Sequence, residues 1–193
     1  MSSFARIALL SAALLPALAQ AQTYTIEPTH TFPTWSVTHM VSTFTGKFTK
    51  TTGTITLDHE AKTGAIHIEV DPKSVLSGVK KLDEHMQNHH FFNSDKFPKI
   101  VFDSTQVTFN GDVPVSAAGT LTMLGITKPV TLAVDNFKCM PHPFFGGTIC
   151  GADIKTVIKR SEWGMTYGIP MVGDEVTLNI EIEAFKDKLG GPK

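Results

Sequence analysis

Short segments in which apolar and polar residues alternate recur along most of this chain. Clear examples are residues 54–57, 66–70, 121–123 and 176–183. A period of two places successive side chains on opposite faces of a strand, so that one face meets water and the other an apolar interior. Because nearly every such segment has one polar face, the sequence predicts a sheet that closes on itself, since closure removes unpaired edge strands.

Turn residues separate the predicted strands, and Asn110-Gly111 is a strong hairpin signal. Between two strands, residues 79–92 place Leu82, His85 and Met86 near the spacing of one helix face. The predicted fold class is therefore all-β, an antiparallel barrel of about eight strands with one amphipathic helix. The strand segments are residues 23–28, 34–40, 45–58, 65–71, 99–109, 116–123, 130–138, 149–160 and 176–185.

The first residues predict an export signal. Arg6 precedes an apolar run that ends at Leu18, and the small-x-small pattern at Ala21 predicts cleavage after that residue. The run is short of the roughly 20 residues that span a bilayer, which disfavours the alternative of an uncleaved anchor. We expect a signal peptide at 1–21, one barrel domain at 22–187, a flexible tail at 188–193, and a soluble protein in the periplasm.

The charge pattern excludes one class of partner. The formal net charge is −1, and no segment forms a basic stripe. Binding to nucleic acid depends on such a stripe, so nucleic acid is not expected as a partner.

The two cysteines, Cys139 and Cys150, flank a segment that is typical of a hairpin tip. An oxidising compartment favours a disulfide between them. The alternative is a reactive or metal-binding pair, but the spacing matches neither a redox CxxC motif nor a zinc motif.

Several blocks of sequence, taken in order and spacing, resemble the YceI-like family over roughly residues 24–184. The resemblance implies a lipocalin-like antiparallel barrel of eight main strands with an elongated internal cavity. It also implies bound polyisoprenoids, including isoprenoid quinones, or fatty-acid derivatives in some members, and it supplies no catalytic residues. The cysteine hairpin is similar to a subgroup of exported members. The matching blocks are residues 27–31, 36–40, 46–48, 53–55, 91–93, 97–105, 119–122, 125–130, 159–164 and 172–176.

Alternation alone fits a filled core as well as a hollow barrel, and the resemblance favours the hollow barrel. A buried lipid tail would gain about 25 cal/mol per Å² of apolar area removed from water. Aromatic and methionine side chains outside the strands, including Phe144 and Met171, could line the mouth. The residues predicted to line the ligand are Trp35, Val37, Ile55, Leu57, Ile68, Val70, Phe91, Phe92, Phe97, Ile100, Phe102, Leu121, Met123, Leu132, Val134, Ile154, Ile158, Met165, Leu178 and Ile180.

The helix histidines support a rival hypothesis, a metal-dependent enzyme. His85 and His89 stand four residues apart and could bind a metal from one helix face. However, Met86 follows His85, so the HExxH motif is absent, and no third ligand can be named. The nucleophile motif G-x-S-x-G, the P-loop and GxGxxG are absent too.

The sequence therefore predicts a lipid carrier or store, not an enzyme, with no metal and no cofactor beyond a bound lipid such as a polyisoprenoid or a ubiquinone-type quinone. The expected partner is a long-chain isoprenoid or acyl lipid. Transient contact with a membrane or with a lipid-delivering protein, and pairing with a second copy, are further expectations. A filled barrel that binds a protein partner is the remaining alternative.

Overall fold

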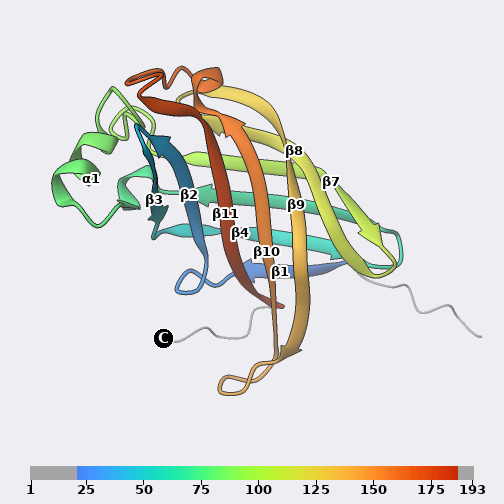
Figure 1. The fold of residues 1–193 in the computed structure, drawn as a ribbon. Coiled ribbons are helices and arrows are strands. Elements are labelled where there is room, and N and C mark those ends of the chain that lie inside the picture. Colours follow the sequence, from blue (N-terminus) through green and yellow to red (C-terminus); the bar gives the residue numbers. More distant parts are fainter. Residues whose placement is uncertain (1–20, 187–193) are drawn as a thin grey trace, which may run out of the picture.

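The computed structural model describes residues 21–186. The predicted signal peptide, apart from Ala21, and the predicted tail at 188–193 lie outside the described residues. The described chain forms a continuous antiparallel sheet of 11 strands and, within these residues, a single α-helix (Figure 1). The all-β prediction is confirmed.

Eight of these strands form a closed ring, because the first strand pairs with the last. Neighbours in the ring are antiparallel, and most follow one another in the chain. Closure leaves no free edge around this part of the sheet, as the alternating pattern predicted. In ring order the strands are β1 (Gln22–Ile26), β4 (Thr51–Asp58), β5 (Thr63–Val70), β7 (Ile100–Asn110), β8 (Val113–Met123), β9 (Ile126–Pro141), β10 (Thr148–Lys159) and β11 (Val172–Lys186).

Strand β11 has two successive partners along the same side. Its first part pairs with β2 (Phe32–His39) up to Glu181, and its end pairs with β1 from Ala184. The turn between β1 and β2 lies at this change of partner. Strand β2 continues into β3 (Ser42–Phe48), which pairs with the short β6 (Val75–Leu76).

The helix α1 (Lys80–Gln87) lies on the side of the molecule where β2 and β3 lie (Figure 1), and it contacts β6. Two short 3₁₀ helices, Pro72–Ser74 and Arg160–Trp163, precede β6 and follow β10. Apolar side chains from α1 and its neighbours form a cluster with Trp35, Phe48 and Met86.

Two sequence predictions need correction. The predicted strand at 45–58 is two strands, because a corner at Thr49 and Lys50 is held by the distant Ser74. The Thr49 N–H donates to the Ser74 carbonyl, and the Lys50 N–H donates to Ser74 Oγ. The predicted helix at 79–92 ends at Gln87, since the Asn88 backbone is extended, and hydrogen-bonded turns follow it.

Candidate ligand-binding cavity

A cavity of about 590 Å³ occupies the inside of the barrel. This volume lies within the range of small-molecule sites. Many inward-facing apolar side chains, such as Ile68, Leu178 and Ile180, are only half-buried, because they face this space and not a neighbouring side chain. The described barrel is therefore hollow, which argues against the filled-core alternative.

With one exception, all the side chains predicted to line the ligand do line the cavity. The exception is Phe97, whose ring packs over Gly125, a position in the loop between β8 and β9. Phe144 and Met171 are not part of the lining and are exposed. Direct cross-strand pairs join Ile68 to Phe102 and Phe102 to Leu121 on β5, β7 and β8. The alternating pattern predicted that these three side chains face inward, and all three line the cavity.

Sequence reasoning missed part of the lining near α1. Phe44 and Phe48 line the cavity from β3, which the merged strand prediction obscured. Leu82, His85 and Met86 line it from α1. The amphipathic spacing of the helix was a signal for these three residues, since its apolar face had to lie against the sheet. Tyr167 lines the cavity from a loop and carried no periodic signal.

Aromatic rings gather where α1 meets the loop that precedes β11. The rings of His90 and Tyr167 are stacked, with centroids 4.3 Å apart and planes 12° apart. His85 packs edge-on against Phe91 and Tyr167, at 5.2 and 5.5 Å between ring centroids. Desolvation lowers the pKa of His90, and the neighbouring His89 and His85 lower it further. These surroundings therefore favour a neutral imidazole at position 90.

The contacts of Asn88 fix the tautomer of His85. The Asn88 side-chain oxygen accepts a hydrogen bond from the His90 backbone N–H at 2.9 Å, so the amide nitrogen is the group 3.0 Å from His85 Nδ1. An amide nitrogen only donates, so Nδ1 accepts, and the neutral ring carries its hydrogen on Nε2. Within residues 21–186, Nε2 has no hydrogen-bond partner.

Two further polar atoms in the cavity wall have no partner among the described residues. They are Trp35 Nε1 and Thr51 Oγ1, and both side chains are buried. The other tryptophan, Trp163, is different, because its Nε1 donates to the Leu121 carbonyl at 3.1 Å. A buried donor without a partner costs about 1–3 kcal/mol, and the Trp35 N–H has almost no accessible surface, so the cavity does not reach it either.

Arg160 also lines the cavity, but its guanidinium is committed to the protein. It donates to the backbone carbonyls of Met165, Val172 and Gly173 at 2.8–2.9 Å. Burial lowers the pKa of Arg160, and nearby Asp174 acts in the opposite direction. Arg160 therefore holds the loop before β11 in place. No other lysine, arginine, aspartate or glutamate among the described residues lines the cavity.

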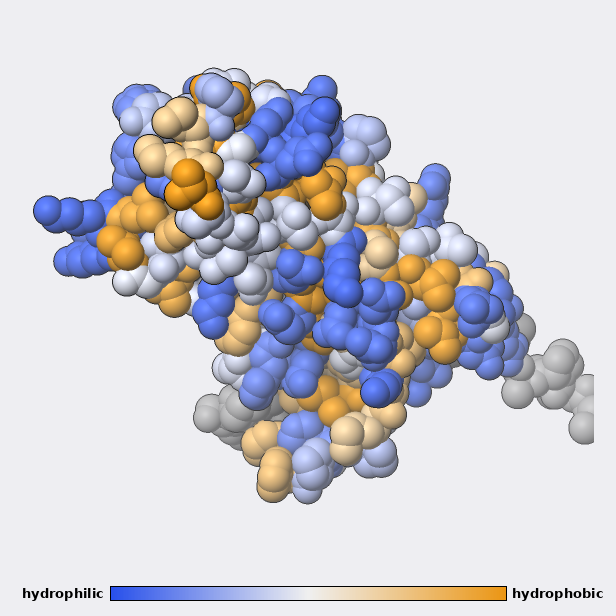
Figure 2. All heavy atoms as spheres, viewed as in Figure 1, coloured by the Kyte–Doolittle hydropathy of each residue, from blue (hydrophilic) through white to orange (hydrophobic). Residues whose placement is uncertain are grey.

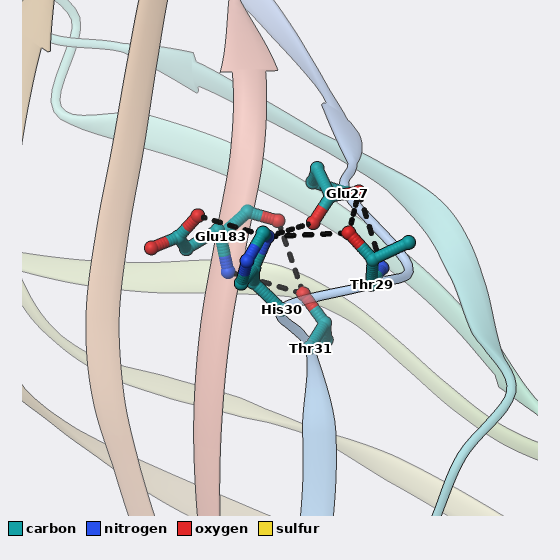
Figure 3. A network of polar contacts seen from close by, with 5 residues as sticks. All are labelled: Glu27, Thr29, His30, Thr31 and Glu183. Carbon is teal, nitrogen blue, oxygen red and sulfur yellow. Dashed lines mark hydrogen bonds and ion pairs between the residues drawn. The ribbon is translucent and has the colours of Figure 1, made fainter. Parts of the chain in front are cut away.

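The helix histidines do not form a three-ligand cluster within the described residues. Three possible ligand groups, Glu27, His30 and Glu183, instead come within 4.8 Å of one another at the β1–β2 turn (Figure 3). The Glu27 carboxylate already accepts hydrogen bonds from the Thr29 N–H and hydroxyl and from His30 Nδ1. Thr31 Oγ1 donates to the Glu183 carbonyl and accepts from the Glu183 N–H. These contacts brace the turn where β11 changes partner.

Cys139 and Cys150 face each other across β9 and β10 and form a disulfide. The predicted pairing is confirmed. The disulfide lies at the base of the hairpin that carries Phe144 and Phe145. It therefore ties the two strands together at the end of the barrel away from α1.

No helix within residues 21–186 has the length and apolar character needed to cross a membrane.

The closed ring and its apolar cavity define a β-barrel protein that can enclose a slender apolar ligand. Comparison with known proteins specifies the family: this chain belongs to the YceI-like family, whose domain matches residues 24–184. A UPF0312 protein from Pseudomonas putida (strain GB-1) is 32% identical, over 96% of this chain and 98% of that protein. Protein YceI from Salmonella arizonae is 30% identical, over 84% of this chain and 85% of that protein.

Solved structures show the same fold. BcnA from Burkholderia cenocepacia has a TM-score of 0.71 at 20% identity and covers 82% of this chain and 99% of that one. A polyisoprenoid-binding domain from Saccharophagus degradans, described as implicated in plant cell wall breakdown, has a TM-score of 0.64 at 14% identity. It covers 84% of this chain and 98% of that domain. At these identities the likeness establishes the fold alone.

Proposed function

We propose that this protein is a periplasmic lipid-binding protein that holds a polyisoprenoid or isoprenoid quinone inside its barrel for transport or storage. The observation that carries the proposal is the apolar cavity of about 590 Å³ that fills the inside of the ring. Such a cavity suits an insoluble chain, because each Å² of apolar surface removed from water contributes about 25 cal/mol. We propose binding, not catalysis.

Two further observations support the ligand class. Aromatic and methionine side chains such as Phe92, Phe102 and Met123 line the cavity, and these adapt to an irregular branched tail. The structural neighbour from Saccharophagus degradans carries a polyisoprenoid-binding description. We transfer that ligand class to this chain as part of the proposal.

The periplasmic location is supported by the predicted signal peptide and by the disulfide. A disulfide between Cys139 and Cys150 persists in an oxidising compartment. In an aqueous compartment between two membranes, a free polyisoprenoid needs a carrier. The barrel would supply the apolar surroundings that water does not.

We further propose that the protein contacts a membrane briefly through a rim of apolar side chains beside α1. We define this rim as Met40, Val41, Tyr167, Ile169 and Met171. Val41 is 100% exposed and Met40 60% exposed, and the Met40 N–H donates to the Met171 carbonyl at 2.7 Å. Figure 2 shows apolar residues gathered at this end, over the tips of β2 and β3.

The backbone of the rim also favours a functional role. Met40 has a φ of 52°, in the left-handed region that glycine and asparagine occupy readily and methionine rarely does. An exposed methionine in this conformation is a poor choice for a turn. Contact with lipid would account for an apolar side chain at this exposed position, since a lipid surface would bury it. Pairing of two copies through the rim is the competing expectation, but a stable interface takes about 20–30 residues a side.

A metal-dependent enzyme is the second candidate function. The geometry gives it little support, because the helix histidines bring no third ligand group within reach in residues 21–186. Metal analysis of the purified wild type and of the His85→Ala, His89→Ala variant separates the two. Stoichiometric metal that the variant loses would favour the enzyme.

The decisive experiment is lipid extraction. The protein is purified from its native periplasm without detergent, extracted with organic solvent and analysed by mass spectrometry. We expect a prenyl lipid near one molecule per barrel. Repeated recovery of an empty barrel that takes up neither prenyl nor acyl lipids would contradict the proposal.

A further inference from the structure

Three histidines at the end of α1 have no role in the function proposed so far, yet their rings pack together. The ring centroids of His89 and His90 lie 4.1 Å apart, and those of His85 and His90 lie 5.6 Å apart. The His90 ring is stacked on Tyr167, which belongs to the loop that precedes β11. We call these four rings the histidine cluster. Because His85 and Tyr167 both line the cavity, the cluster joins two parts of the cavity wall.

The hydrogen bonds of the Asn88 side chain suit a neutral ring at position 85. The amide nitrogen donates to His85 Nδ1 at 3.0 Å, and the amide oxygen accepts from the His90 N–H at 2.9 Å. A second proton on the His85 ring would occupy Nδ1 and would face the amide nitrogen, donor against donor. Turning the amide over would satisfy Nδ1 but would face a donor toward the His90 N–H. Protonation at position 85 therefore breaks one of the two hydrogen bonds.

The ring of His90 suits the neutral form for a different reason. Its Nδ1 is buried and has no hydrogen-bond partner among residues 21–186. In the neutral ring this atom can remain without a hydrogen, whereas in the charged ring both nitrogens carry one. A buried N–H of a charged ring is costly without an acceptor. Water would supply the acceptor if the ring moved out of the cluster.

The charged side chains of α1 are occupied elsewhere or exposed. Asp83 accepts hydrogen bonds from the N–H and the hydroxyl of Ser77. Glu84 pairs with Lys80 at 3.8 Å, and Lys81 is exposed. The helix therefore brings no unpaired carboxylate to its own histidines.

The neighbouring elements bring none either. In the loop, residues 164–171 contain one titratable side chain, Tyr167, and the Arg160 guanidinium donates to backbone carbonyls. Strands β2, β3 and β6 contain no acidic residue, and β2 adds a further imidazole to the cavity wall, His39. On the turn after α1, Asp95 pairs with Lys73 at 2.6 Å. Protons taken up by the cluster therefore add positive charge without a counter-charge, and like charges repel.

On the basis of the lipid-binding function proposed above, we propose that the histidine cluster is a pH-sensitive gate of the cavity. At neutral pH the neutral rings pack together, and the wall between α1 and the loop stays closed. In acid, charge on His85 and His90 separates the loop from α1, opens the wall and lets the lipid leave. The ends of the loop stay in place, because Arg160 holds the carbonyls of Met165 and Val172.

The direction of the pH dependence follows from His90. Desolvation, and then the charges of His89 and His85, lower its pKa below the ordinary value of 6.5 while the cluster is closed. A ring that has left the cluster regains the ordinary value, so the open form binds protons more readily than the closed form. The closed form therefore keeps its full advantage above about pH 6.5 and loses it as the pH falls below that value.

The rate at which a bound probe leaves the barrel tests the gate. Full-length mature protein is loaded from cyclodextrin with a radiolabelled ubiquinone that has four isoprene units. Release to excess cyclodextrin, an uncharged acceptor, is then followed at about pH 7.5 and at about pH 5. We expect the wild type to release the probe several-fold faster at the lower pH. In His90→Phe the ring can stack but cannot be charged, so the acceleration should be smaller, and in the double variant His85→Gln, His90→Phe it should be lost.

A stacked histidine at the other end of the barrel supplies the matched control. His142 lies on Phe145, with ring centroids 4.8 Å apart and planes 25° apart, and it does not line the cavity. The variant His142→Phe should show the same acceleration in acid as the wild type. Because the readout is a ratio of two rates in one variant, a change common to both pH values cancels.

The outcomes separate the gate from the lipid-binding function. If the wild type releases the probe equally fast at both pH values, or if the double variant keeps the full acceleration, the gate is wrong and the lipid-binding function stands. The gate is also wrong if circular dichroism shows that the wild-type barrel unfolds at the lower pH. If the wild type binds neither this probe nor another prenyl or acyl lipid at neutral pH, both proposals are wrong.

Discussion

The carboxylate of Glu27 accepts a hydrogen bond from His30 Nδ1 at 2.7 Å, beside the point where β11 changes partner from β2 to β1 (Figure 3). Burial alone would raise the pKa of Glu27. The hydrogen bonds from Thr29 and His30 outweigh burial and lower the pKa below its ordinary value of 4.5. The charged form is therefore the one that stabilises the closed ring.

Because the pKa of Glu27 is lower in the folded protein than in the unfolded chain, its contribution is fully present above about pH 4.5 and is lost as the pH falls through the lowered value. We expect Glu27→Gln to lower the free energy of unfolding by about 1–3 kcal/mol at pH 7. The difference from wild type should shrink below pH 4. Urea unfolding at pH 7 and at a pH below 4 measures the difference in free energy of unfolding between variant and wild type. The control is Glu183→Gln, whose more exposed carboxylate lies 3.8 Å from His30. An equal loss at both pH values would contradict this account.

The disulfide should stabilise the barrel through the unfolded chain. The double variant Cys139→Ser, Cys150→Ser opens a loop with a sequence separation of 11, and we expect a loss of roughly 3 kcal/mol in the chain-entropy estimate. Reduced wild type should unfold at the same urea concentration as the double variant. A midpoint that does not move on reduction would show that strand pairing alone holds the hairpin.

Arg160 should be essential for the loop that precedes β11. In Arg160→Met the carbonyls of Met165, Val172 and Gly173 lose their donor, and we expect a loss of about 3 kcal/mol or more, because each unpaired buried acceptor is costly. Since the loop carries Tyr167 into the cavity wall, the variant should also release bound lipid faster. Denaturant unfolding and lipid off-rates measure the two effects. A loss below about 1 kcal/mol would be inconsistent with this role.

A larger side chain in the cavity wall should exclude the lipid tail without disrupting the closed ring of strands. Val134 lines the cavity and pairs with Ile154, another lining residue. We expect Val134→Trp to reduce affinity for a four-isoprene probe at least about tenfold, because tens of Å² of tail surface lose their place. The matched control is Val157→Trp on β10, where the side chain is 58% exposed and does not line the cavity. Equal affinities of Val134→Trp and Val157→Trp for the probe would show that the lipid tail does not occupy the cavity beside Val134.

The rim should govern transfer of lipid and not its final affinity. In Met40→Asn, Val41→Ser, asparagine suits the left-handed backbone at position 40, so the fold should be kept. We expect uptake from phospholipid vesicles to slow several-fold while affinity for cyclodextrin-delivered probe is unchanged. The control removes two other exposed apolar side chains, Phe144 and Phe145, from the hairpin tip at the opposite end. Slower uptake in the control alone would move the contact to that tip, and a change in oligomeric state in the rim variant would favour a second copy.

Much of the barrel could be predicted from sequence, because its cause is local. Alternation at Ile66 and Ile68 or at Leu178 and Ile180 decides which side chains face inward whatever the partner strand is. The corner at Thr49 could not be predicted, since its hydrogen bonds come from Ser74, and no local pattern marks that distant contact.

The candidate site divides in the same way. Its apolar wall follows from periodicity, whereas its polar chemistry depends on tertiary contacts. The tautomer of His85 depends on how Asn88 is held by the His90 backbone, and the unpartnered N–H of Trp35 depends on the ring lying against Gly46. Phe97 was misplaced for the same reason, because a loop residue has no periodicity to show which way it faces.

The double pairing of β11 has a consequence for the order of folding. Thr31 and Glu183, which hydrogen-bond where β11 changes partner, are 152 residues apart in the chain. Such distant pairing forms slowly, since the entropy of closing a long loop is lost before the contact forms. The ring cannot close until β11 arrives, so the apolar interior stays open in every shorter intermediate. Chaperone binding and aggregation should therefore both peak just before the last strand joins, and a variant that weakens β11 should accumulate as an open sheet and not as an empty barrel.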